Sequence, residues 1–511
     1  MANNRVTLDR FITAFRRATR AVLSRVRARR HPARRSELAW TAPDRKMTEG
    51  VALGAAPREG AVVAFCNRSA GAMRDTVIVR DPLPPRPGDL GYQRGAVVTV
   101  TSRYWNRAID ALRDQASGTG LAVLHTHPGT GTPDWSPDDQ RADAALAQFL
   151  FGEGFLPPHA PLVSLVASHT ALRGRVLWLD PLSNVVSMIP IERVRTISLS
   201  QIALAWTADR SGTHREPEIP AAADRSVRVF GKSGQRELAD LHVAVVGNGG
   251  VGSMCAEHLA RWGVGTISTW DPDRVENVNI NRSGVFTWAD ARRKRLKART
   301  VAVALDRFAL VRPIRTLWSA SDVRDARELP RLLDADVIVS LVDDARPRHF
   351  LNRLAGAHYI PVVDGGNVVR STAEDDADAE VAQVEGAAIR VSVIVPGGPC
   401  LWCAGHLTSQ RLSLAYRSDE DKTADRARGY VEHLGPEHAP SVMPINVATA
   451  ALLELRLMDL LFHLSGRPVA EVYLDAINGS LDELPRVRKA TCRQCGRWIG
   501  HGELAELPHI E

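Results

Sequence analysis

The sequence has 511 residues, of which 44% are hydrophobic, so the chain is long enough to bury two or three hydrophobic cores. Its formal net charge is +7, but residues 1–35 contain eleven arginines and one acidic residue, a local charge of +10 that leaves about −3 for the rest. This distribution argues against a nucleic-acid-binding surface spread over the whole protein. The most apolar stretch, residues 445–464, carries two acidic residues, an arginine and an asparagine, so we expect no transmembrane segment. We find no secretory signal and expect a cytoplasmic protein.

Composition and periodicity divide the chain into four parts. Residues 1–37 form a basic segment in which apolar residues recur at helical spacing among arginines. We interpret this segment as a solvated tail or as a helix that docks on the protein itself; contact with nucleic acid or an anionic surface is the alternative. Residues 38–206 have the pattern of a mixed α/β domain, residues 207–225 resemble a polar linker, and residues 226–511 contain a nucleotide-binding pattern.

Short apolar runs predict the strands of both domains. In the first domain they lie at residues 60–66, 76–79, 96–100, 120–125, 162–167 and 176–179, with helices at 104–116 and 137–152. In the second domain, strands at residues 335–342, 360–364 and 388–395 follow two earlier ones and alternate with helical segments. That alternation predicts a largely parallel, doubly wound sheet.

A glycine-rich turn begins the nucleotide-binding pattern. An apolar run at residues 241–246 ends at the sequence GNGGVG, residues 247–252, and a helical pattern follows. A strand, a glycine turn and a helix present free backbone N–H groups to an anion. A second strand at residues 266–270 ends in Asp271, where a nucleotide-binding fold has its ribose acceptor. The motif alone fits NAD or FAD as well as ATP.

The residues after the second strand favour ATP. Asn279 and Arg282 supply amide and cationic groups that a triphosphate requires and a dehydrogenase does not. The spacing D-x-D-x-V-x-x-x-N-x-x-R resembles the ThiF/MoeB family of adenylyltransferases, which are related to ubiquitin-activating enzymes. The resemblance covers residue 225 to the C-terminus and implies that ATP and Mg²⁺ are bound by Gly247, Gly249, Gly250, Gly252, Asp271, Asn279, Arg282, Lys297 and Asp343.

The same resemblance extends to further residues. Arg348 and Asn352 fit the family pattern downstream of Asp343. Family members often supply an arginine from a partner subunit, and Arg228 is the candidate here, with Arg225 as the alternative. The resemblance therefore implies a homodimer.

A second group of residues predicts a catalytic zinc site. His125 and His127 are two residues apart at the end of a predicted strand, and Asp139 lies near the start of a predicted helix. Two imidazoles and one carboxylate leave a fourth zinc position for water, as catalytic sites require. The motif H-x-H-P followed by S-x-x-D resembles the JAB/MPN (JAMM) metalloproteases. The resemblance implies zinc on these three residues, Ser136 as an oxyanion donor and an upstream glutamate as general base.

Two details of this second resemblance are specific to the chain. Glu59 precedes a predicted strand, as the family's general base does, and Glu49 is the weaker candidate. Eight residues separate His127 from Ser136, one more than the family usually has. A metal-free domain that only binds a partner is therefore an open alternative, as is a group of merely hydrogen-bonded surface residues.

Four of the six cysteines form two C-x-x-C pairs, Cys400 with Cys403 and Cys492 with Cys495. Two such turns can close a tetrahedral site without water, so we predict a structural zinc, with a redox dithiol as the alternative. We interpret Cys66 and Cys255 as packed core thiols. No cysteine lies between Cys403 and the predicted helix near residue 445, where ubiquitin-activating enzymes carry their thioester cysteine.

Together these patterns predict a JAB/MPN-type mixed α/β domain followed by a Rossmann-like, doubly wound ThiF-type domain with a four-cysteine zinc site. The function expected is bifunctional, within a bacterial-type ubiquitin-like pathway. A zinc peptidase would process a ubiquitin-like or sulfur-carrier protein, and an ATP-dependent adenylyltransferase would activate its C-terminal glycine, with a downstream conjugating enzyme as a further partner. An NAD-dependent oxidoreductase is the alternative from another class.

Overall fold

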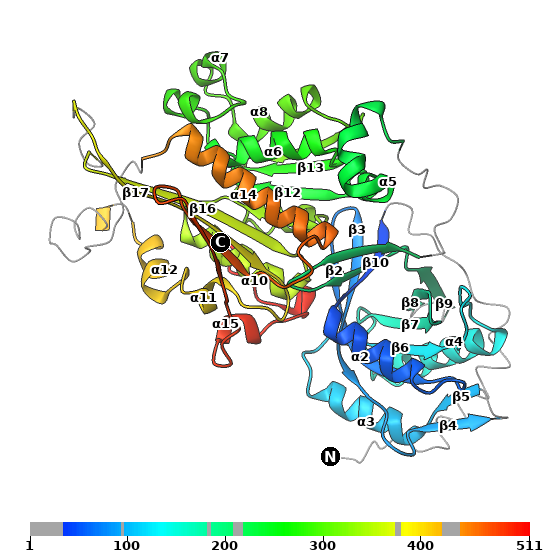
Figure 1. Cartoon of the computed structure of the whole chain (residues 1–511). Helices are drawn as coiled ribbons and strands as arrows, with labels where there is room; N and C mark the ends of the chain where they lie inside the picture. The colour runs from blue at the N-terminus through cyan, green and yellow to red at the C-terminus, as the bar shows by residue number, and fades with distance from the viewer. Residues whose placement is uncertain are drawn as a thin grey trace.

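The computed structural model describes residues 34–93, 97–180, 185–207, 218–373, 380–418, 420–421 and 440–510. The basic, amphipathic stretch expected at the start of the chain lies outside these residues up to position 33. The described residues form an amino-terminal unit, residues 34–207, and a carboxyl-terminal unit, residues 218–510, each built on one large sheet (Figure 1). The last residues of the predicted basic segment belong to a strand, β1 (Arg35–Thr41).

The amino-terminal unit contains a nine-stranded mixed sheet in the order β11-β10-β1-β3-β2-β6-β7-β8-β9. Five of the six predicted strands belong to this sheet, and the sixth, β5, pairs with β4 in a separate ribbon. The strands other than β1 are β2 (Ala61–Ala70), β3 (Arg74–Leu83), β4 (Leu90–Gln93), β5 (Val97–Val100), β6 (Gly120–Thr126), β7 (Leu162–Ala167), β8 (Leu172–Asp180), β9 (Val185–Pro190), β10 (Arg193–Ile197) and β11 (Ile202–Trp206).

Both faces of this sheet are covered. On one face, α3 (Ser102–Arg113) and α4 (Pro137–Gly152) bury Tyr104, Trp105 and Leu150 against alternate residues of β2 and β6. On the other face, α2 (Ala42–Leu53) packs through Ala52 against the opposite set of side chains. A sheet buried on both faces has strands that are apolar at almost every position, which is the pattern of β2.

The carboxyl-terminal unit contains an eight-stranded sheet in the order β14-β13-β12-β15-β16-β17-β18-β19. Strands β14 to β16 are parallel, but β17, β18 and β19 are each antiparallel to their neighbours. The predicted largely parallel sheet is therefore correct for one part only. The strands are β12 (His242–Val246), β13 (Thr266–Trp270), β14 (Arg315–Ser319), β15 (Val337–Ser340), β16 (Val362–Ser371), β17 (Val384–Ile394), β18 (Glu471–Asp475) and β19 (Ser480–Leu484).

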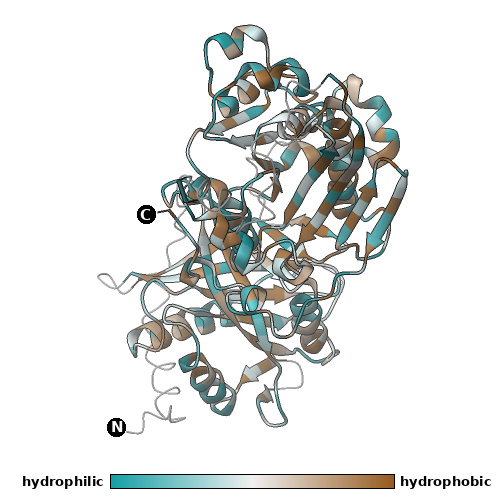
Figure 2. Ribbon diagram, turned by 90° about the vertical axis from the view of Figure 1, so that its left-hand side faces the viewer, coloured by the Kyte–Doolittle hydropathy of each residue, from teal (hydrophilic) through white to brown (hydrophobic). Residues whose placement is uncertain are grey.

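Helices cover this second sheet on both sides. On one side, α6 (Gly250–Trp262) and α14 (Met443–Phe462) cross the sheet next to each other (Figure 1). On the other side, α10 (Ala345–His358) buries Phe350 and Leu354 against β15 and β16. Figure 2 shows brown, hydrophobic segments on strands of both units, interrupted by teal, hydrophilic ones. None of the helices described combines the length and the apolar composition needed to cross a membrane.

The two units share a buried interface. Ala39, Ile78 and Ile197 of the first unit belong to the same hydrophobic core as Leu238 and Val243 of the second. Charged side chains are buried beside this core: Glu37, Arg193 and Arg195 are at most 1% exposed. Their ion pairs are completed by Arg74 of β3 and by Asp336, which directly precedes β15.

Candidate functional sites

A cavity of about 1130 Å³ opens over the carboxyl ends of β12, β13 and β15 and extends along β16, β17 and β18. Parallel strands of this kind bind ligands at that edge of the sheet. All nine residues that the ThiF/MoeB resemblance assigns to ATP and Mg²⁺ line the cavity: Gly247, Gly249, Gly250, Gly252, Asp271, Asn279, Arg282, Lys297 and Asp343.

The structure explains why glycine suits three positions of the turn. Gly247 has φ +88°, and a Cβ there would lie 2.5 Å from the backbone oxygen of Leu341. A Cβ on Gly252 would lie 1.9 Å from the oxygen of Gly247, so glycine permits the close approach of α6 to the turn. A Cβ on Gly249 would meet no protein atom within 4 Å. The space above Gly249, at the N-terminus of α6, is therefore open to an anionic ligand.

Asp271 lies between the turn and the cavity. Its Oδ2 accepts from the backbone N–H of Asn248 at 2.6 Å, and its Oδ1 accepts from that of Asp273 at 2.9 Å. Burial nevertheless raises the pKa of Asp271, because the desolvation of the carboxylate outweighs nearby Lys297 and these two hydrogen bonds. Each oxygen keeps a lone pair, so the carboxylate can still accept from ribose hydroxyls.

Cationic and amide side chains from the segments that follow β13 also line the cavity. Lys297, the first residue of α8 (Lys297–Ala304), donates from Nζ to Asp273 at 2.9 Å and is largely buried. Asn279 accepts from the N–H of Glu276 through its Oδ1 and thereby fixes the short 3-10 helix η3 (Asn277–Arg282), which ends in Arg282. Arg282 at the end of η3 and Lys297 at the start of α8 thus both line the cavity.

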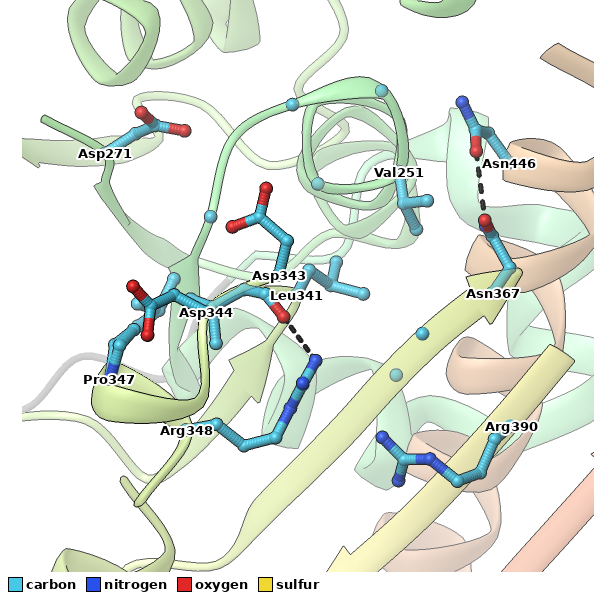
Figure 3. A pocket seen from close by; sticks show the side chains of 18 of the residues that line it. Val251, Asp271, Leu341, Asp343, Asp344, Pro347, Arg348, Asn367, Arg390 and Asn446 are labelled. Carbon is cyan, nitrogen blue, oxygen red and sulfur yellow. Dashed lines mark hydrogen bonds between the residues drawn. The ribbon is translucent and has the colours of Figure 1, made fainter. Parts of the chain in front are cut away.

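Acidic residues follow β15. Asp343 projects into the cavity and points away from the Arg348 guanidinium (Figure 3). Its neighbour Asp344 caps α10 by accepting from the N–H of Arg346 at 2.7 Å. Arg348 donates to the backbone oxygen of Val342 and, at 3.1 Å, to Asp364. Carboxylate oxygens at such a strand end are suitable Mg²⁺ ligands.

The far side of the cavity was not predicted. There, Arg390 of β17 donates to Asp364 at 2.5 Å, and His406 and Arg486 bind the buried carboxylate of Glu471 at 2.7 Å. The only sequence signal was Asp364 at the end of a predicted strand. Arg390 falls within the predicted strand at residues 388–395 but was not assigned to a site, and the other residues lie in segments for which the sequence pattern predicted no strand.

The structure also brings His125, His127 and Asp139 together. Their candidate ligand atoms lie within 4.8 Å of one another. Nε2 of His125 is 3.6 Å from Asp139 Oδ1, and Nε2 of His127 is 3.5 Å from Asp139 Oδ2. Ligand bonds of about 2.0–2.2 Å are compatible with these separations, so the three residues fit zinc.

The electrostatics of this group are those of a cation site. Burial acts to raise the pKa of Asp139, but the adjacent imidazoles of His125 and His127 outweigh it and hold that pKa far below its usual value. The hydrogen bond to Asp139 raises the pKa of His127 in turn. Nε2 of His125 is buried without a hydrogen-bond partner, as expected of a ligand atom.

The structure distinguishes the two glutamate candidates. Oε1 of Glu59 lies 3.8 Å from His127 Nε2, whereas Glu49 pairs with Arg45 on α2. Ser136 donates to Asp139 Oδ2 at 2.7 Å, and its oxygen accepts from the N–H of Asp139, which forms a capping box at the start of α4. Ser136 therefore orients the carboxylate in this structure.

The four cysteines of the two C-x-x-C pairs form one cluster. The sulfur atoms of Cys400 and Cys403 are 3.7 Å apart, and those of Cys403 and Cys495 are 3.6 Å apart. Sulfur atoms around one tetrahedral zinc have about this separation, given Zn–S bonds of about 2.3 Å. The remaining two, Cys66 and Cys255, are buried in the cores.

Two further residues implied by the resemblance lie elsewhere. Asn352 accepts from the N–H of Leu401 and so positions the first cysteine turn, outside the cavity. Arg228 is exposed on α5 (Asp224–Asp240), where it pairs with Asp224, and it does not line the cavity of its own chain.

The carboxyl-terminal part of the chain is similar to known proteins. The model of the ThiF family matches residues 223–493. The chain is 29% identical over 174 residues to the SAMP-activating enzyme E1 of Haloferax volcanii, covering 34% of this chain and 56% of that protein. It is 29% identical over 182 residues to the sulfur carrier protein ThiS adenylyltransferase of Bacillus subtilis, covering 34% and 46%. The chain thus spans about half the length of these curated relatives.

Among solved structures, E. coli MccB with ATP is similar, with a TM-score of 0.39 and 18% identity over 54% of this chain and 75% of that one. The family match covers more than half of the sequence and contains the whole glycine turn, both cations and Asp343. The chain belongs to the ThiF family.

Proposed function

We propose that the carboxyl-terminal unit uses ATP to adenylate a carboxylate. The observation that carries this proposal is that Arg282, Lys297 and Asp343 line the same cavity as the glycine turn, where the space above Gly249 is open. Cations on both sides of a phosphate site, together with a magnesium-binding carboxylate, suit a triphosphate better than a nicotinamide dinucleotide.

The reaction requires that two anions meet. A carboxylate oxygen attacks the α-phosphorus of ATP, the bond to the β,γ-diphosphate breaks, and pyrophosphate leaves with the electron pair. Lys297 and Arg282 lower the repulsion between the reactants and stabilise the charge that develops on the phosphates. Asp343 would hold Mg²⁺, which supplies further charge neutralisation when bound. Asp271 would orient the ribose.

The substrate we propose is the C-terminal glycine of a ubiquitin-like or sulfur-carrier protein. Two relatives support this class, since one is named for the activation of SAMP and the other for the sulfur carrier ThiS. Arg228 would act on the cavity of a second copy, which makes the active form a homodimer. The adenylate would then pass to an external acceptor, for example a conjugating enzyme.

Exchange of pyrophosphate into ATP tests this function. The exchange is measured with ubiquitin-like proteins that end in glycine, and NADH binding is measured in parallel. We expect exchange in the wild type and a loss of about 100-fold or more in Asp343→Ala, because Mg²⁺ would lose a ligand. Asp306→Ala, which removes an exposed carboxylate outside the cavity, is the control. Equal rates in Asp343→Ala and the control would contradict the assignment.

We propose a second activity for the amino-terminal unit: JAMM-type zinc hydrolysis after the glycine of the same substrate. It is supported by the separations among His125, His127 and Asp139 and by the proximity of Glu59 to His127. Zinc would polarise water when bound, and Glu59 would take its proton. Hydrolysis would free the carboxylate that the other unit adenylates.

A fusion of the substrate to a reporter through its C-terminal glycine tests this activity. Glu59→Gln should abolish cleavage and keep its zinc, whereas Glu49→Gln should cleave like the wild type. If the wild type binds the substrate, holds no zinc at His125, His127 and Asp139 and cleaves nothing, the unit is the metal-free binding module. An active Glu59→Gln would instead exclude this glutamate as the base.

A further inference from the structure

The cavity has a second end that the adenylation chemistry does not use. We call this the distal end and define it by Arg390, His406, Arg411, Glu471, Tyr473 and Arg486, all of which line the cavity. The glycine turn, Asp271 and Lys297 lie at the opposite end, across strands β15, β16 and β17.

Arginines dominate the distal end. Arg348 and Arg390 share one buried carboxylate, Asp364, at 3.1 and 2.5 Å. Arg486 and His406 share Glu471. Arg411 donates to the backbone oxygen of His406. Together with Arg348, the three arginines of the distal end outnumber the two buried carboxylates, Asp364 and Glu471, which leaves an excess of positive charge.

Neither carboxylate can repel an arriving anion strongly. Burial acts to raise the pKa of Glu471, but hydrogen bonds from His406, Arg486 and Ser392 lower this pKa to about 2. Glu471 is therefore ionised, and its negative charge is neutralised by these donors. Asp364 is completely buried beneath Arg348 and Arg390, which hold its pKa below the usual value despite the desolvation. The guanidinium groups, which are partly exposed, are what a ligand meets.

The floor between the two ends is flat. Gly366 of β16 is paired with Arg390 of β17, and a Cβ on Gly366 would point toward the Nη2 atoms of both Arg348 and Arg390, 3.8 Å away. A larger side chain there would stand over the floor. Figure 3 shows Arg348 and Arg390 along this part of the cavity.

The strand spacing gives the length of the floor. From β15, which Asp343 follows, to β18, which carries Glu471, there are three strand intervals. At about 4.8 Å per interval this is about 14 Å, and an extended chain advances about 3.3 Å per residue, so about four residues span it.

We infer that the distal end selects a substrate tail with an acidic side chain at the third, fourth or fifth residue from its C-terminus. The terminal carboxylate lies beside the Mg²⁺ that Asp343 would hold, the extended tail crosses Gly366, and the acidic side chain pairs with Arg390, Arg411 and Arg486. This specificity rests on the adenylation proposed above, because it assumes that the tail enters the same cavity as ATP.

Labelled ten-residue peptides that end in Gly-Gly test this specificity. Each peptide carries glutamate, glutamine or lysine at the third, fourth or fifth residue from its C-terminus. Binding to the full chain is followed by fluorescence anisotropy, and pyrophosphate exchange is measured with the same peptides. We expect the best glutamate peptide to bind about tenfold more tightly than its glutamine counterpart, because only glutamate forms hydrogen bonds between two charged groups with the arginines. The lysine peptide should bind more weakly still.

A charge reversal provides the second arm. Arg411→Glu should shift the preference toward the lysine peptide, which also shows that the variant is folded, while Arg307→Glu, on the exposed surface outside the cavity, should keep the wild-type order. Equal binding of the three peptides, or no binding of any, would overturn the inference. Binding with the expected order but without exchange would support it and would count against adenylation instead.

Discussion

Arg74 on β3 donates from Nη1 to Oδ1 of Asp336 at 2.5 Å and so joins the two units through their buried interiors. Asp336 also accepts from Arg193 and from the backbone N–H of His242, while Glu37 binds both Arg74 and Arg193. Burial acts to raise the pKa of Asp336, but the three surrounding arginines hold it well below its usual value. Each unit thus supplies charges that the other one neutralises.

Replacing Asp336 with alanine should destabilise both units together. Among the residues that the structure describes, the change leaves three buried arginines with Glu37 as their only carboxylate partner, and breaking a buried ion pair costs about 3–5 kcal/mol. We expect a lower midpoint of thermal unfolding and a single calorimetric transition in both proteins. The control is Asp110→Asn, which removes an exposed ion pair with Arg113 and should cost less than about 1 kcal/mol. Two separate transitions in the wild type would show that the interface does not couple the units.

This interface explains which strands the sequence predicted. β2, β6 and β7 are apolar at nearly every position because both of their faces are covered, and the apolar runs identified them. The sequence pattern did not predict β1 and β10, because Glu37, Arg193 and Arg195 interrupt their apolar runs. Glu37 pairs with the buried arginines, and Arg193 also pairs with Asp336, which is 143 residues away in sequence. No local pattern indicates such a partner.

Acid should weaken this interface through buried histidines. Burial lowers the pKa of His242 to about 4, and in the unfolded chain the ordinary value of about 6.5 returns. The folded state therefore binds fewer protons than the unfolded state, so His242 contributes stability above about pH 6.5 that is lost as the pH falls toward about 4. The loss from this residue between pH 7 and pH 5 is about 2 kcal/mol. His358 forms a hydrogen bond with Ser69 across the interface, and burial lowers its pKa to about 3. His358 therefore also loses its contribution to stability as the pH falls.

Urea unfolding at pH 7 and pH 5 measures this effect. His242→Gln can keep hydrogen bonds to Asp334 and Ser268 without titrating. The variant should lose less stability than the wild type over this range, by about 2 kcal/mol. Parallel losses in the two proteins would mean that His242 is already protonated in the fold or does not control acid stability.

Metal analysis should find about two zinc ions per chain. Cys492→Ser removes one thiolate of the cysteine cluster, and His127→Ala removes one imidazole of the other group, so each variant should retain about one zinc. Cys492→Ser should also lose several kcal/mol of stability, because a structural zinc contributes its binding energy to folding. The control, Cys255→Ala, should keep both ions. A wild type with one zinc would identify one of the two groups as metal-free.

The candidate sites were predictable to the extent that their residues are close in sequence or follow strand ends. The GNGGVG turn, Asp271, Arg282 and the H-x-H pair all follow apolar runs, and parallel strands bring such residues to one edge. The distal end was missed for a different reason. Arg390 and Glu471 are far apart in sequence and are brought together by the antiparallel pairing of β17 with β18, while the pairing of β18 with β19 returns Arg486 to Glu471.

Lys297 offers the sharpest kinetic test of the adenylation site. Lys297→Met should lower the maximal rate of pyrophosphate exchange by about 100- to 1,000-fold, because a cation aimed at the transition-state charge is lost, and should change the KM for ATP much less. Asp273→Asn should have a smaller effect, since Lys297 keeps its charge but loses the carboxylate that holds Nζ. If Asp273 acts through Lys297, the double variant should be no slower than Lys297→Met alone. Arg292→Met, an exposed change outside the cavity, is the control. If the rate of the double variant is instead reduced by the product of the two single reductions, Asp273 acts independently of Lys297.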